Sequence, residues 1–254
     1  MALVRAPYAP IRTPVALTVG AELKVDAGML RSLDAREVNV SEAFTIVDAT
    51  GTFFRASLKL RDEKSGRAVA YEKMPRSPES PAHITLVCPV LGRQRMLTVC
   101  QKATELGVAR IVPVVSDHSV QRDGIEHEKP WAWKGQCIKA ARQCRRGSLP
   151  ELTEVISFNE ALSAPFWAEA SQRFALDDRS PIDHDPFAPT SEPPAPSDVV
   201  LVVGPEGGFS DPERARLDEH HAIVLALGGR VLRAETAVYV GLTVLQHRMG
   251  DLRA

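Results

Sequence analysis

Residues 199–241, VVLVVGPEGGFSDPERARLDEHHAIVLALGGRVLRAETAVYVG, contain two apolar runs that each end in glycines. The first run, Val199 to Val203, stops at Gly204, and the second, Ile223 to Leu227, stops at Gly228. Short apolar runs bounded by glycine are typical of buried parallel strands, so we predict two neighbouring strands of one sheet. Glycine allows a positive φ and lets a ligand approach the main chain. Because ligands of open α/β sheets bind beyond the carboxyl ends of strands, the two loops predict a cofactor cleft.

The same glycines have a plainer interpretation as ordinary strand-to-helix turns. One glycine pair fits either interpretation, whereas two pairs at the ends of neighbouring strands favour the cleft. The loop at 204–208 is not followed by Gly-Lys-Ser/Thr, and it lacks the Gly-x-Gly-x-x-Gly of a dinucleotide fold. A nucleotide hydrolase or a nicotinamide enzyme is therefore disfavoured.

The composition of the 254 residues, 44% hydrophobic and 25% charged, is ordinary for a globular protein. No apolar run approaches the roughly 18 residues of a membrane span, and the N-terminal apolar segment is too short for a signal peptide. We therefore expect a cytoplasmic protein without membrane contact. The four cysteines form no Cys-x-x-Cys, so we interpret them as core thiols rather than as zinc ligands or a disulfide framework, and we expect no metal. They are Cys88, Cys100, Cys137 and Cys144.

Charge is distributed unevenly along a chain whose net charge is −1. Residues 93–146 hold eleven lysines and arginines against five acids, whereas residues 177–220 hold three against eleven. The first stretch predicts a basic face for nucleic-acid phosphates, although solvated helix faces give similar counts.

Three segments of different character divide the chain. Residues 1–75 alternate short β-rich pieces with turns, as in a small β domain. Residues 76–82, RSPESPA, are rich in proline and serine and predict an interdomain linker. Residues 83–254 alternate apolar strands and amphipathic helices, which predicts an α/β domain with a mainly parallel sheet.

Local signals place the elements of this second domain. We expect strands at 84–90 and 111–115 and a helix at 94–107, which Gly107 ends. Pro130 opens another helix, Ser210-Asp211-Pro212-Glu213 starts a third, and Glu235-Thr236 begins the last. An apolar stripe follows on the last helix, comprising Val238, Leu242, Leu245 and Met249.

Residues 176–197 are dense in proline, aspartate and serine and predict a long loop. His184 lies between two aspartates there, which suggests a metal site, but a solvated acidic loop is the better interpretation because no second cluster supports a metal.

Three motifs identify a family resemblance: GPEGGFSDPE (204–213), LGGRVLRAETA (227–237) and QKATELGVARIVPV (101–114). Together they resemble ribosomal RNA small subunit methyltransferase E, a family of the SPOUT class. The resemblance implies a small N-terminal PUA-like RNA-binding barrel, followed by a SPOUT-type α/β trefoil-knot domain that binds S-adenosylmethionine and forms a homodimer. It implies methylation of N3 of one uridine in 16S ribosomal RNA of the small subunit. The competing class is a non-catalytic RNA-binding or ribosome-assembly factor that retains the fold.

The resemblance, together with the chemistry it implies, suggests residues for three roles. The catalytic candidates are Arg233 and, second, Arg230, with Glu206 or Glu235 orienting the guanidinium; a structural Arg–Glu pair that fixes the loop is the alternative. The residues expected at the cofactor are Val203, Gly204, Pro205, Glu206, Gly207, Gly208, Leu227, Gly228, Val231, Leu232, Glu235 and Thr236. Those expected at the RNA substrate are Arg31, Lys102, Glu105, Gln143 and Arg146, and an exposed surface arginine is the alternative for Arg31.

Within residues 83–254 the chain departs from the family pattern at four places. Gly229 stands where the family has proline, Ala234 where it has threonine, and Lys139 where it has glutamate. Leu176-Asp177-Asp178 stands where the family has a His-Pro sequence near the cofactor. None of these changes deletes an arginine or glutamate of the catalytic set, so we expect an active enzyme.

Overall fold

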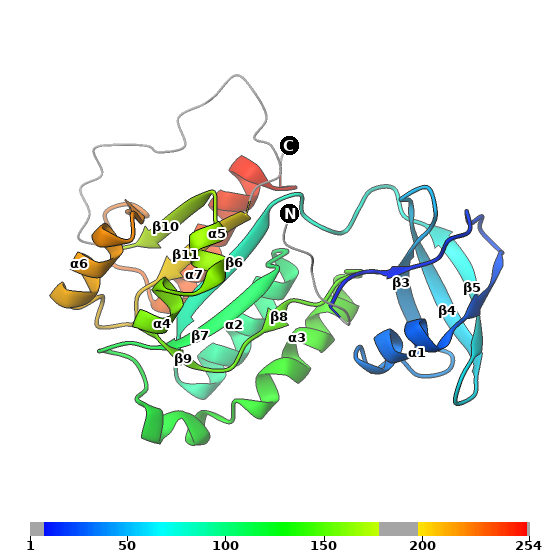
Figure 1. Ribbon diagram of the computed structural model, residues 1–254, viewed down its shortest axis with the longest axis horizontal. Coiled ribbons are helices and arrows are strands. Elements are labelled where there is room, and N and C mark those ends of the chain that lie inside the picture. Colours follow the sequence, from blue (N-terminus) through cyan, green and yellow to red (C-terminus); the bar gives the residue numbers. More distant parts are fainter. Residues whose placement is uncertain (1–7, 178–197, 253–254) are drawn as a thin grey trace. The chain divides into compact units, whose positions relative to one another are not determined.

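The computed structural model describes residues 8–177 and 198–252 (Figure 1). The chain forms two compact units, which are described separately. The first unit comprises the residues up to Glu79 together with Cys137–Leu149, and the second comprises Ser80–Gln136 and the residues from Pro150 onward. The division lies within the expected 76–82 connection. Residues 137–149, which the sequence placed in the second domain, group with the first unit instead.

The first unit is built on a five-stranded, mainly antiparallel sheet, as expected from its short β-rich pieces. Strand β4 is bulged at two places, which bends it and curls the sheet around its core. Asp26 caps the only helix described in this sheet region through the backbone N–H of Met29. The elements are β1 (Ile11–Arg12), β2 (Glu22–Val25), α1 (Ala27–Asp34), β3 (Ala43–Val47), β4 (Phe53–Arg61) and β5 (Gly66–Lys73), in the sheet order β1-β3-β4-β5-β2.

Buried charges attach residues 137–149 to this sheet. The Glu79 carboxylate accepts hydrogen bonds from the backbone of Gly147 at 2.7 Å and Ser148 at 3.0 Å. The Arg36 guanidinium donates to the Gly147 carbonyl at 2.8 Å, and burial lowers the pKa of Arg36 to about 10 while Glu79 opposes that change. Because both partners lie far from 147 in sequence, no local pattern could have predicted this attachment.

The second unit is built on a seven-stranded sheet in which all the pairings are parallel. The strands expected at 84–90, 111–115 and 199–203 are confirmed. One expectation was wrong: the strands that end at the two glycine loops are not neighbours, because β10 lies between β11 and β12 and pairs with both. The strands are β6 (His83–Pro89), β7 (Arg110–Val115), β8 (Glu151–Leu152), β9 (Ile156–Ser157), β10 (Gln172–Leu176), β11 (Asp198–Val203) and β12 (Ile223–Leu225). Their order is β12-β10-β11-β6-β7-β8, with β9 paired to β7.

The position of β12 explains a second difference. Its first residue, Ile223, is 41% exposed, because β12 is the edge strand and only one neighbour covers it. The second strand of the glycine pair is therefore not fully buried, and it ends at Leu225 rather than Leu227.

Helices cover both faces of this sheet. On one face α4 (Phe158–Leu162), α5 (Pro165–Glu169) and α6 (Asp211–Glu219) share a core with Val87, Val200 and Val202. On the other, α7 (Ala234–Met249) packs against α2 (Arg93–Glu105) and β11. The remaining helices are η1 (Arg122–Glu128) and α3 (Trp131–Gln143). In the part of the chain described, no helix combines the length and apolarity needed to cross a bilayer.

The helix boundaries follow the expected signals. Ser210 caps α6 in a complete capping box with Glu213. Gly107 follows α2 with a φ of +78°, the left-handed conformation that ends helices. The stripe predicted on the last helix is buried in α7.

One buried amide joins the two helices that pack on this face. The Gln246 side chain is fully buried on α7; it donates to the Leu106 carbonyl at the end of α2 and accepts from the Ser80 hydroxyl, both at 2.7 Å. Gly107 and Gly250 leave room for it, since a Cβ at either position would lie 2.8 Å or less from a Gln246 side-chain atom.

We predict that Gln246→Leu lowers the free energy of unfolding by about 2 kcal/mol, because it leaves the partly buried Leu106 carbonyl and Ser80 hydroxyl without this partner. Chemical denaturation of the full chain measures this. Gln94→Leu, at an exposed position of α2, is the matched control and should change stability by less than about 0.5 kcal/mol. Equal effects of the two variants would contradict the role of Gln246.

Candidate functional site

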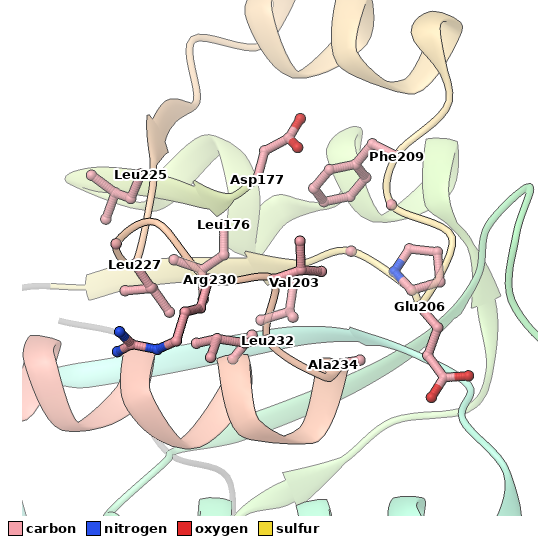
Figure 2. Close-up of a pocket in the computed structure, with 16 residues that line it drawn as sticks. Leu176, Asp177, Val203, Glu206, Phe209, Leu225, Leu227, Arg230, Leu232 and Ala234 are labelled. Carbon is pink, nitrogen blue, oxygen red and sulfur yellow. The ribbon is translucent and has the colours of Figure 1, made fainter. Parts of the chain in front are cut away.

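A pocket lies beyond the carboxyl ends of β10, β11 and β12, where the chain enters α7 (Figure 2). Three segments and the first turn of α7 form its wall, and most of the lining side chains are aliphatic. The lining residues are Leu176, Asp177, Val203, Gly204, Pro205, Glu206, Gly208, Phe209, Leu225, Leu227, Gly228, Arg230, Val231, Leu232, Ala234 and Ala237.

The backbone of the second glycine loop is available to a ligand. From Leu227 to Leu232, no backbone N–H or C=O makes a hydrogen bond within the described residues. In the first loop, the Gly208 N–H closes a turn onto the Pro205 carbonyl at 2.9 Å, while the N–H groups of Glu206 and Gly207 have no partner within the described chain. Residues 206–207 and 228–231 are exposed, so these unpaired backbone groups face solvent and can be reached by a bound molecule.

Different physical constraints act at the glycines of the two loops. Gly208 and Gly228 have φ values of +70° and +93°, which other residues adopt only with strain. Gly204 packs closely on the buried Phe209 ring, because a Cβ there would lie 3.3 Å from it and the ring would have to shift slightly. Gly229 has neither constraint: no atom of the described residues lies within 4 Å of its Cβ position.

Glu206 pairs with Arg95 of α2 rather than with an arginine of the second loop. Both side chains are partly exposed, so the pair holds the first loop near α2 but stabilises it only modestly. Figure 2 shows Glu206 and Arg230 at opposite ends of the pocket. The expected structural pairing of Arg233 with Glu206 is therefore not formed.

Arg233 is the N-cap residue of α7 and does not line the pocket. Neither the Arg230 nor the Arg233 side chain makes a hydrogen bond or ion pair with any described residue, and both residues are exposed. Glu235 does not pair with Arg233 either, since its buried Oε2 has no hydrogen-bond partner in the described chain. Two cations at the rim are thus free to meet a negatively charged group.

Glu235 lies in apolar surroundings beside two further groups that can ionise. Burial, together with the nearby Glu235 carboxylate, raises the pKa of the Cys88 thiol and of the Tyr239 hydroxyl to about 12 in each case. Both groups are therefore neutral at physiological pH, so we assign neither of them an acid or base role.

An ion pair between Asp177 and Arg214 lies at the end of β10, where this strand contributes to the pocket wall. Asp177 is 8% exposed and its carboxylate accepts from the Arg214 guanidinium of α6 at 2.6 Å. This hydrogen bond raises the pKa of Arg214, which stays charged. Arg214 also lies beside Gly208, with its Nη2 3.5 Å from the Cβ position there. The pair therefore fixes the end of β10 against the first glycine loop.

Most of the expected cofactor residues lie around this one pocket. Gly207, Glu235 and Thr236 are the ones that do not line it. Several lining residues were missing from the expected set: Leu176, Asp177, Phe209, Leu225, Ala234 and Ala237. The predicted parallel sheet was the signal that could have found the residues at the strand ends, because the strands beside β11 end at the same edge of the sheet.

The residues expected to contact RNA belong to both units and are described within each. Arg31 is exposed on α1, and Lys102 pairs with Glu105 at 2.8 Å on α2. Gln143 is exposed near the end of α3, but Arg146 is only 8% exposed and pairs with Glu79 at 3.1 Å. In this structure Arg146 stabilises the turn that follows α3. The sequence predicted a contact with RNA for it.

Ion pairs with acidic side chains also neutralise part of the basic stretch at residues 93–146. Arg142 pairs with Glu42 at 2.6 Å and Arg145 with Glu72 at 2.9 Å. These acids lie outside residues 93–146, so the local count overstated the free positive charge.

Metal ligation finds no support among the residues described, since no group of three or more histidine, cysteine or acidic side chains could hold an ion there. His184 lies outside the described residues.

The parallel sheet and its pocket define an α/β protein with a ligand site at the strand ends. Comparison with known proteins identifies its family. A family model for an RNA methyltransferase domain matches residues 78–246. Ribosomal RNA small subunit methyltransferase E of Buchnera aphidicola is 30% identical over 189 residues, which are 72% of this chain and 73% of that protein. The chain belongs to the ribosomal RNA small subunit methyltransferase E family, as the three motifs indicated.

Two solved structures resemble the whole chain. The Neisseria gonorrhoeae enzyme of the same name, bound to S-adenosyl methionine, is 27% identical with a TM-score of 0.64, covering 96% of this chain and 99% of that one. A Legionella pneumophila methyltransferase in complex with the cofactor SAM is 30% identical with a TM-score of 0.64, covering 95% and 98%.

Proposed function

We propose that this protein methylates N3 of one uridine in 16S ribosomal RNA of the small subunit, with S-adenosylmethionine as the methyl donor. The observation that carries the proposal is the pocket at the strand ends, with two glycine loops whose backbone groups lack partners in the described chain. The cofactor bound in the two solved relatives supports the choice of ligand.

The residues present fit this cofactor. Val203, Leu225 and Leu227 give an apolar wall that suits an adenine ring, and the unpaired N–H and C=O groups of 227–232 suit its polar edges. When bound, S-adenosylmethionine supplies an electrophilic methyl group on a sulfonium centre. The chain need only hold and orient both partners, so proximity accounts for much of the proposed rate enhancement.

The arginines at the rim have a role suited to uridine chemistry. N3 lies between two carbonyls on the Watson–Crick edge, so the base must be unpaired to be reached. As N3 loses its proton, negative charge spreads onto those carbonyls, and a fixed guanidinium lowers the energy of that state. Arg230 and Arg233 are suited to this because neither guanidinium is paired with a described residue and both residues are exposed. Glu206 and Glu235 then act on the loop or the cofactor rather than on Arg233.

The larger organisation is part of the same proposal. We assign the curled N-terminal unit a PUA-like role in binding RNA, with Arg31 as a contact, and the parallel-sheet unit a SPOUT-type trefoil knot. Family resemblance and the 37% exposed Val240 of α7 favour a homodimer through this second unit. A stable monomer in light scattering at micromolar concentration would contradict the dimer.

Isotopic methyl transfer to small subunits that lack this modification tests the function, with naked 16S RNA assayed in parallel. We expect one methyl group per RNA, recovered after nuclease digestion as 3-methyluridine, and a reverse-transcription stop at that site because the Watson–Crick edge is blocked. Cofactor binding without transfer to either substrate would favour the non-catalytic RNA-binding or assembly factor. Transfer to a different atom would overturn the proposed specificity.

Adjacent glycines test the cofactor site. Gly228→Ala places a side chain at a φ of +93°, a conformation that costs about 1 kcal/mol. The free loop of the variant relaxes away from this conformation and binding must restore it, so the Kd for S-adenosylmethionine should rise about fivefold. Gly229→Ala is the control, because its Cβ position is open and its φ is outside the left-handed region, so the Kd should stay within twofold. Calorimetric titration measures both. Equal affinities for the two variants would place the cofactor elsewhere.

The two rim arginines should separate catalysis from binding. If a guanidinium stabilises charge on the uracil carbonyls, its replacement by alanine lowers single-turnover methylation on the order of 10² and leaves the cofactor Kd unchanged. We expect this for Arg233→Ala and, second, for Arg230→Ala, with partial rescue by lysine because a point charge lacks the planar fork. Parallel losses of Tm, cofactor affinity and turnover would instead assign a structural role.

A further inference from the structure

The turn that follows β7, residues 116–121, lies against the first glycine loop. These residues lie outside the three family motifs. The Asp117 carboxylate accepts from the Ser210 hydroxyl at 2.5 Å, and the Asp117 N–H donates to Glu213 at 3.0 Å. Glu213 is 5% exposed, so this second bond is anchored in the core. The turn is thus fixed to the start of α6, where the glycine loop ends.

The turn is also rigid in itself. The Ser119 hydroxyl accepts from the Ser116 N–H at 2.9 Å and donates to the Ser116 carbonyl at 3.0 Å. The Gln121 side chain donates to the same carbonyl at 3.0 Å. A side chain carried by this turn therefore has a well-defined position.

His118 is the side chain that the turn presents to the glycine loop. Its Nδ1 lies 2.9 Å from the Gly208 carbonyl, and because a carbonyl only accepts, Nδ1 carries the hydrogen. A Cβ at Gly207 would lie 2.9 Å from the His118 Cβ, so only glycine allows this approach. The imidazole therefore packs on one residue of the loop and bonds the next.

We propose that His118 is a positioning residue for the cofactor: it holds the Gly207-Gly208 peptide so that the loop is set for binding before the ligand arrives. This rests on the proposed function. His118 does not line the pocket, whereas Gly208 does, so the effect passes through the loop. A loop already held in its binding conformation loses less entropy on binding, which increases affinity.

The chemistry of the contact selects the variants that test it. The amide of asparagine places an N–H near the position of Nδ1, whereas the longer glutamine carries its amide beyond that position. His118→Asn should therefore keep the bond to Gly208, and His118→Ala and His118→Gln should lose it. His127→Ala is the matched control, since His127 is exposed on η1 and makes no contact with the loop.

Three measurements on the full-length protein decide the matter: the Kd for S-adenosylmethionine, Tm without ligand, and amide hydrogen exchange of residues 205–208 without ligand. For His118→Ala and His118→Gln we expect a Kd raised about threefold to tenfold and faster exchange in the loop, as for loss of one hydrogen bond. Tm, and kcat at saturating cofactor, should stay near the wild-type values. His118→Asn and His127→Ala should resemble the wild type throughout.

Each failure has a distinct signature. A wild-type Kd for His118→Ala, or a parallel fall of Tm and kcat with no rescue by asparagine, would overturn the positioning role while leaving the proposed function intact. A wild-type protein that binds no S-adenosylmethionine would contradict the proposed function, and this role with it.

Discussion

The parallel pairing of β10 with both β11 and β12 is the constraint on which the site depends. Parallel strands end at the same edge of a sheet, so this pairing brings Asp177, Gly204 and the loop after Leu225 together although they are far apart in sequence. Helix α7 completes the pocket because it packs very close to the sheet. A Cβ at Gly241 would lie 2.7 Å from a methyl of Leu176, so glycine permits the contact.

Charge pairing separates the arginines into two groups. Arg142, Arg145 and Arg146 are matched by glutamates of the first unit and stabilise its fold. Arg230 and Arg233, beside the pocket, have no such partner in the described chain. An exposed cation that is already paired offers less to an incoming phosphate or carbonyl than one that is not. The local arrangement thus favours the rim of the pocket over the end of α3 as the place where charge acts on a substrate.

Local signals in the sequence predicted the elements well. The capping box of Ser210 and Glu213, the glycine after α2 and the apolar runs of β6, β7 and β11 each depend on residues within a few positions. Most of the pocket followed from the same runs, because a strand that ends in glycines marks its own carboxyl end.

Features that depend on distant residues could not be predicted in this way. Nothing local places β10 between β11 and β12, since the pattern of a strand does not specify its neighbours in the sheet. The partner of Glu206 proved to be Arg95, and the partner of Arg146 proved to be Glu79, each far away along the chain. His118 gave no signal, because a single exposed histidine is unremarkable until the loop that it contacts is known.

The central claim is that the backbone of the two glycine loops binds the cofactor. Amide hydrogen exchange with and without S-adenosylhomocysteine, the demethylated product of S-adenosylmethionine, tests this most directly. The account predicts slower exchange at Glu206, Gly207 and residues 227–232, with little change in α1 and the curled sheet of the first unit. Unchanged exchange in both loops at saturating ligand, or protection confined to other segments, would contradict it.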